Sequence, residues 1–128
     1  MAKDCEKMKA GKALDHARMA ARSVFSKFST KGIPYMFKFG VTAGPSHRWE
    51  NASYGYKHDK WDRMYVVHKT DNTGTALMME AALIALFDSA PGCQNVAKGG
   101  ENPPRTSPCY VYFVVRGLSP PGVPGVFA

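Results

Sequence analysis

The sequence predicts an α/β domain of the α+β type, with a small central β-sheet of about three strands flanked by helices. Helix-like and strand-like segments alternate along the chain, in the order helix, strand, helix, strand, helix, strand. The hydrophobic fraction of 45% is typical of a globular protein. A length of 128 residues suits one such domain and leaves little room for a second.

The first two elements are expected to be a helix and a strand. Apolar side chains recur at helical spacing between Lys and Arg residues over residues 4–28, which predicts the helix. Gly32 and Pro34 then break it. The strand is expected over residues 34–42, where three aromatic side chains occupy alternate positions and so share one face: Tyr35, Phe37 and Phe39.

Four more elements complete the predicted order. A short helix is expected over residues 46–52, after a Gly-Pro pair, and a second strand over residues 61–69. Residues 71–74 form a turn whose Asp, Asn and Thr side chains can accept backbone N–H bonds at a helix start. The helix that follows is expected to run to about Ala90. The third strand, residues 109–115, is expected to be the most buried.

The positive charge is concentrated at the N-terminal end. The formal net charge is +7, and residues 1–31 carry eight Lys or Arg against three Asp or Glu. We therefore divide the chain into a basic N-terminal helical arm (1–31), a folded domain (32–117) and a Pro/Gly-rich tail (118–128). A basic arm beside a near-neutral body indicates contact with a polyanion such as nucleic acid. The alternative is a solvated helix face that only improves solubility.

Neither an export signal nor a membrane-spanning segment is expected. The longest apolar run is well below the roughly 20 residues of a spanning helix, and the N-terminus is too charged for a secretory signal. The three cysteines, Cys5, Cys93 and Cys109, lack metal-ligand spacing, and we expect them to be reduced. These features predict an intracellular protein, cytoplasmic or nuclear, without a membrane partner.

Glu80 is the only charge in the most apolar segment of the chain, residues 75–87. Carboxylates are almost never fully buried unless something pairs with them. Two interpretations follow. Glu80 lies at the edge of an amphipathic helix face, or it points into a polar pocket or at a cation such as Arg48.

Several residues in the middle of the chain form an ordered series. A strand pattern, Phe37-Lys-Phe-Gly-Val-Thr42, precedes Arg48, which is followed by Glu80 on a helix and then by Asn95. This series resembles the GIY-YIG nuclease superfamily over residues 33–115. The strand resembles the family's second signature, Arg48 its catalytic arginine, Glu80 its metal-binding glutamate, and Asn95 the asparagine after that helix.

The resemblance implies a nucleic-acid-binding domain, with DNA preferred to RNA, that acts as a metal-dependent endonuclease on phosphodiester bonds. Glu80 would bind one Mg²⁺ or Mn²⁺ ion, which suits a site with a single carboxylate. Arg48 would clamp the phosphate oxygens through its forked donors. Tyr35 or Lys38 would assist the attacking water. Asn95 completes the catalytic set, with Tyr54 and Tyr56 as further candidates for the tyrosine role.

Two departures from the family's pattern keep other functions open. Tyr35 lies only a few residues before Gly40, whereas the family's first tyrosine lies about ten residues before the second signature, and Lys38 stands where the family has its second tyrosine. The alternative is therefore a catalytically degenerate fold that binds nucleic acid or protein. A purely structural or protein-interaction module is a third class. Whether the chain is an enzyme stays open.

Overall fold

The computed structural model describes residues 10–53, 55–94 and 107–118, and within them it confirms the α+β class. Every predicted element is present, in the predicted order, and the ends that can be compared differ by a few residues. Residues 4–9 of the first predicted helix lie outside the described residues. The elements are α1 (Ala10–Thr30), β1 (Tyr35–Thr42), α2 (Pro45–Glu50), β2 (Arg63–Thr70), α3 (Thr73–Phe87) and β3 (Cys109–Gly117).

The last strand in the chain is the central strand of the sheet. The strand order is β1-β3-β2, and both outer strands run antiparallel to β3. The expectation that residues 109–115 form the most buried strand is confirmed, since every side chain from Val111 to Val115 is buried. The register places Gly40 of β1 opposite Tyr112 of β3.

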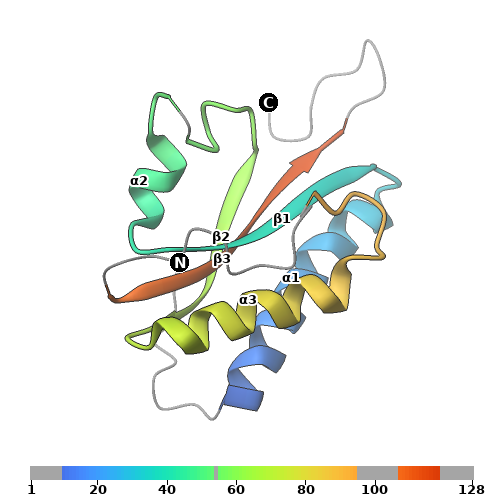
Figure 1. Ribbon diagram of the computed structural model, residues 1–128. Coiled ribbons are helices and arrows are strands. Elements are labelled where there is room, and N and C mark those ends of the chain that lie inside the picture. The colour runs from blue at the N-terminus through green and yellow to red at the C-terminus, as the bar shows by residue number, and fades with distance from the viewer. Residues whose placement is uncertain (1–9, 54, 95–106, 119–128) are drawn as a thin grey trace.

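The helices divide the sheet into two unlike faces (Figure 1). Helices α1 and α3 lie together on one face, which we call the α1–α3 face, and α2 lies on the other, the α2 face. The alternation of side chains along the strands sends one set to each side. On the α1–α3 face the strands contribute the large apolar core residues Phe37, Phe39, Val111, Phe113 and Val115. On the α2 face they contribute Tyr112 and Val114, packed with Trp49, Trp61, Met64 and Val66.

Helix α1, the described part of the expected basic arm, packs on the sheet and shares its core. Its buried side chains form the stripe Ala13, Ala17, Ala21, Val24, Phe25 and Phe28. The ring centroid of Phe25 lies 4.4 Å from that of Phe37 and 5.5 Å from that of Phe113. Small alanines let the helix approach the sheet closely, and its basic residues are left on the outer side.

Helix α3 begins at the predicted cap. The side-chain oxygen of Asn72 accepts a hydrogen bond from the backbone N–H of Thr75 at 2.9 Å, which satisfies one of the unpaired donors of the first turn. The helix ends at Phe87, a few residues before the expected Ala90. Within the described ranges, no helix is long and apolar enough to cross a membrane. Among the described residues, neither Cys93 nor Cys109 is part of a disulfide bond.

Candidate functional site

Arg48 of α2 is held by the segment that follows the helix. That segment folds back on α2: the backbone N–H of Tyr56 donates to the carbonyl of Arg48 at 3.1 Å, and that of Lys57 donates to the carbonyl of Trp49 at 2.9 Å. The guanidinium carbon of Arg48 consequently lies 4.6 Å from the centre of the Tyr56 ring, within the range of a cation–π contact. The arginine side chain is thereby fixed in direction while it stays partly exposed.

Two buried tyrosine hydroxyls complete this cluster. The hydroxyl oxygens of Tyr56 and Tyr112 lie 2.7 Å apart, and the two residues are 4% and 2% exposed. Tyr112 comes from the central strand β3, so a residue far away in the sequence supports the α2 segment. The Arg48 guanidinium interacts with both hydroxyls. We refer to Arg48, Tyr56 and Tyr112 as the Arg–Tyr cluster.

Gly40 makes room for the cluster. It lies on β1 opposite Tyr112, and the Tyr112 ring crosses directly over it. A Cβ atom at position 40 would collide with the hydroxyl end of that ring. Packing therefore explains why a glycine occupies position 40, and no catalytic role is needed to explain it. Only a residue without a side chain lets Tyr112 reach Tyr56.

The electrostatics of the cluster favour a fixed cation and neutral hydroxyls. Burial raises the pKa of Tyr112 far above the ordinary value of about 10; its hydrogen-bonded neighbour Tyr56 adds to this, and Arg48 opposes it. For Arg48, burial acts to lower the pKa, but the two tyrosines outweigh it and the pKa is raised. At neutral pH, Arg48 is therefore charged and Tyr112 is protonated. The cluster offers donors to an anion, and its buried tyrosine is not poised to act as a base.

We expect the stability of the domain to fall in alkali because of Tyr112. The folded state favours the neutral form of Tyr112. The stabilisation that follows from this is fully present below about pH 10, the pKa of tyrosine in the unfolded chain. It is lost as the pH rises through the raised folded-state pKa. Urea unfolding of the parent and of Tyr112→Phe, each at neutral and alkaline pH, checks this. The variant should be about 1–3 kcal/mol less stable at pH 7, because Tyr56 loses its partner, and should lose part of the alkaline decline. If Tyr112→Phe loses as much stability as the parent between neutral and alkaline pH, Tyr112 is not the cause of the decline.

The structure brings together only part of the predicted catalytic set. Lys38 lies on the α2 face, in register with Val114, and so shares a side of the sheet with Arg48. Tyr35 lies on the opposite face, where its ring stacks on those of Phe25 and Phe28 at 5.3 and 5.2 Å. Tyr35 is thus part of the α1–α3 core. Asn95 and Tyr54 lie outside the described residues.

Glu80 lies on α3, the helix that covers the opposite side of the sheet from Arg48. It is one turn after Ala76 and one turn before Ile84, which are both buried, so it belongs to the same stripe of the helix. Its own side chain is half-buried. Among the residues that the structure describes, no three His, Cys, Asp or Glu side chains gather closely enough to hold a metal ion. Glu80 and Arg48 therefore lie on opposite sides of the sheet.

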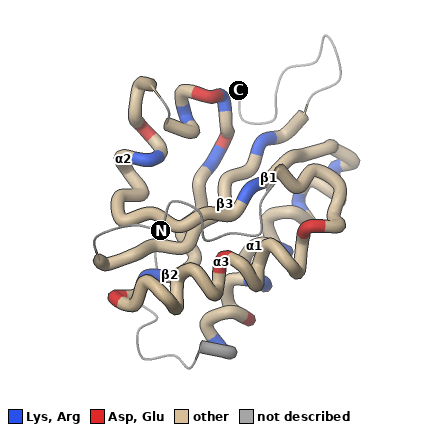
Figure 2. The backbone as a smooth tube through the Cα atoms, viewed as in Figure 1, with Lys and Arg blue, Asp and Glu red and all other residues tan. Residues whose placement is uncertain are grey.

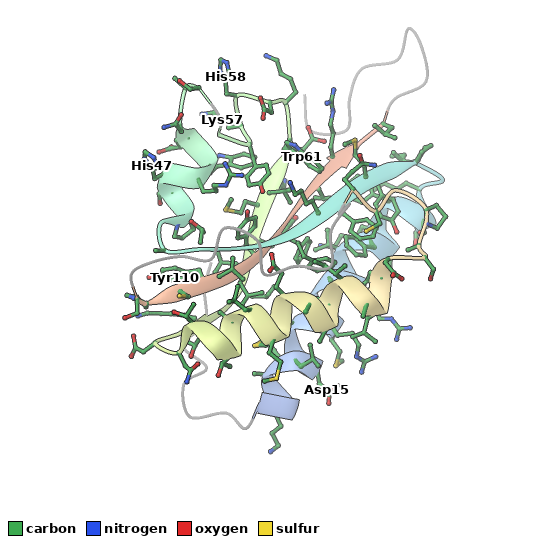
Figure 3. The ribbon with its side chains drawn as sticks, viewed as in Figure 1. Asp15, His47, Lys57, His58, Trp61 and Tyr110 are labelled. Carbon is green, nitrogen blue, oxygen red and sulfur yellow. The ribbon has the colours of Figure 1, made fainter. Side chains whose placement is uncertain are left out.

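Two open pockets lie on the α2 face, as does the Arg–Tyr cluster. The first, of about 600 Å³, is lined by three basic residues, Lys57, Lys60 and Arg116, together with Trp61 and Asp62. The second, of about 520 Å³, lies between α2 and the start of β2 and is lined by Trp49, Met64 and Val66 among others. Figure 3 shows Lys57, His58 and Trp61 at this end of the molecule, and Figure 2 shows basic and acidic residues mixed around it.

Sequence reasoning missed Tyr112, whose hydroxyl contacts that of Tyr56 and whose ring packs over Gly40. One signal was present: in Cys109-Tyr-Val-Tyr-Phe-Val-Val115, alternation places Tyr110 and Tyr112 on the face opposite Val111 and Phe113. The identity of the neighbouring strand was the missing fact, because Tyr112 meets Gly40 only when β3 lies beside β1.

The chain was compared with protein-family models, with curated proteins and with solved structures. No family model, no curated protein and no solved structure matches it. The similarity to the GIY-YIG superfamily therefore remains a hypothesis that rests on the residues of this chain.

Proposed function

We propose that this chain is a nucleic-acid-binding domain whose α2 face contacts the phosphate backbone. One observation carries the proposal: Arg48 is held over Tyr56 by a buried pair of hydroxyls, on the same face of the sheet as an open pocket lined by Lys57, Lys60 and Arg116. A guanidinium fixed in direction can present its forked donors to a phosphate with little further ordering. Interleaved basic and aromatic residues are typical of nucleic-acid-binding surfaces.

The charges of the α2 face support an anionic partner. Its basic side chains outnumber the acidic ones: Lys38, Arg48, Lys57, Lys60 and Arg116 against Glu50, Asp59 and Asp62. Asp62 is already engaged, since its carboxylate accepts a hydrogen bond from the backbone N–H of Gly117 at 2.7 Å. In keeping with the sequence, we propose DNA rather than RNA as the partner and an intracellular setting.

Helix α1 carries a second basic surface on the other side of the sheet. Lys12, Arg22 and Lys27 are exposed there, as is Lys31 directly after the helix, whereas Arg18 pairs with Asp15 at 3.5 Å. The exposed cations are those that the sequence assigned to phosphate contact. Because α1 and α2 cover opposite faces, the two surfaces can be neutralised separately.

A matched pair of variants tests which surface binds. Lys57→Gln/Lys60→Gln and Arg22→Gln/Lys27→Gln each remove two exposed cations, one pair per surface. The affinity of a fluorescently labelled DNA is measured by anisotropy over a range of salt concentrations. We expect the first variant to weaken binding at low salt and to reduce the slope of log affinity against log salt by about 2, one for each phosphate contact. The second variant should stay close to the parent.

Two results would contradict the proposal. An equal or larger loss in Arg22→Gln/Lys27→Gln would move the binding surface to α1. An absence of binding to single- or double-stranded nucleic acid at low salt would leave a protein-interaction or structural role as the better account.

A metal-dependent endonuclease is the second candidate. The observation that favours it is the presence of two tyrosine hydroxyls beside Arg48, since the resemblance assigns the preparation of water to two tyrosines. The positions of Tyr35 and Glu80 weigh against it. Incubation with supercoiled plasmid and Mg²⁺ or Mn²⁺ tests this candidate. It requires metal-dependent nicking that is lost in Glu80→Gln, whereas a domain that only binds leaves the plasmid intact.

A further inference from the structure

Both tryptophans of the chain lie on the α2 face, but they have different surroundings. The Trp61 ring packs edge-on against Tyr56, with centroids 6.0 Å apart, and so belongs to the wall of the Arg–Tyr cluster. Trp49 follows Arg48 in α2, is half-buried, and lines the second pocket. An indole that remains partly open beside a cavity is available to a ligand.

The pocket beside Trp49 has the size and composition of a site for a flat ring. Its volume of about 520 Å³ falls within the range of small-molecule sites. Trp49, Met64, Val66 and Pro45 provide apolar surface, and Ser46 and Asp62 add polar groups. A nucleobase has matching chemistry, with an apolar face and a hydrogen-bonding edge.

The basic pocket adjoins it. Asp62 lines both pockets, and its position is fixed from two sides. Its backbone N–H donates to the carbonyl of Val115 at 3.0 Å, and its carboxylate accepts from the backbone N–H of Gly117. A site for a base and a site for phosphate are thus neighbours on one surface, as the alternating chemistry of a nucleotide chain requires.

We propose that the α2 face selects single-stranded nucleic acid, with one unpaired base stacked on Trp49 and the adjoining phosphates against Lys57, Lys60 and Arg116. Bases inside a duplex are stacked and paired and cannot enter a pocket of this kind, whereas those of a single strand stack readily on aromatic side chains. This inference rests on the proposed function and specifies its substrate.

Trp49 variants test the proposal with a 12-nucleotide DNA, used alone and annealed to its complement. The parent should bind the single strand more tightly than the duplex. Trp49→Ala should weaken single-strand binding about 5- to 150-fold, the cost of one lost base stack, and should weaken duplex binding much less. Trp49→Phe keeps an aromatic ring and should keep most of the affinity. Met78→Ala removes an exposed side chain from α3 on the other side of the molecule and serves as the matched control.

A fluorescence measurement reports on the base directly and does not need Trp49→Ala to fold. In a Trp61→Phe background Trp49 is the only tryptophan, and its emission should be quenched by the single strand and not by the duplex. Duplex binding at least as tight as single-strand binding, or an unquenched Trp49, would overturn this inference and leave nucleic-acid binding intact. Failure to bind either form at low salt would overturn the proposed function as well.

Discussion

We expect Gly40→Ala to destabilise the domain by about 2–6 kcal/mol and to disrupt the α2 face. A methyl group at position 40 collides with the Tyr112 ring. Inserting such a group into a packed site costs about 1–3 kcal/mol, and separating the buried Tyr112 hydroxyl from Tyr56 adds about 1–3 kcal/mol. Urea unfolding monitored by circular dichroism measures the loss, and anisotropy with labelled DNA should show weaker binding because Arg48 loses its support.

Gly44→Ala is the matched control for this prediction. A Cβ atom at Gly44 meets only the Cβ of His47, at 3.6 Å, which is an ordinary contact. The change should cost less than about 1 kcal/mol, the usual size of an effect at a helix cap.

A double-mutant cycle identifies the cause of the Gly40→Ala effect. Tyr112→Leu removes the far end of the ring that the new methyl group would strike. The double variant should therefore be less destabilised than the sum of the single variants. Additive effects would show that the ring of Tyr112 is not what excludes a side chain at position 40.

The elements of the fold were predictable because each depends on local chemistry. The Asp71–Gly74 turn contains Asn72, whose side chain caps α3. The aromatic alternation in β1 follows from the period of two in a strand, and it puts Phe37 and Phe39 in one core. The apolar composition of residues 109–115 indicated the most buried strand.

The candidate site was harder to predict because it depends on strand order. Antiparallel pairing of β3 between β1 and β2 brings Tyr112 under Arg48, although Tyr112 lies 64 residues after Arg48 in the chain (112 − 48). The same alternation that places Lys38 on the α2 face sends Tyr35 to the other face, three residues away. A linear series of residues does not show which face of the sheet each one occupies, and Tyr35 and Glu80 illustrate this.

A chain that begins at Gly32 should fail to fold cooperatively, although residues 32–117 carry the whole sheet. Without α1, the sheet loses the six buried side chains of that helix. The loss of Phe25 alone should cost about 3–5 kcal/mol, as for other buried Phe→Ala changes. The free energy of unfolding of a domain is of the order of 5–15 kcal/mol. Removing the other buried side chains of α1 as well makes the total loss comparable to this whole free energy. Circular dichroism and urea unfolding of the shortened chain check this.

Two comparisons make the deletion informative. A chain that begins at Ala10 retains every described element and should keep a cooperative transition. Arg22→Gln/Lys27→Gln keeps α1 but removes two of its exposed charges, and should unfold near the parent's midpoint. A cooperative transition in the chain that begins at Gly32 would show that α1 is an independent arm. If that chain is unfolded, its loss of nucleic-acid binding reveals nothing about the charges of α1, and only the charge variants separate the two roles.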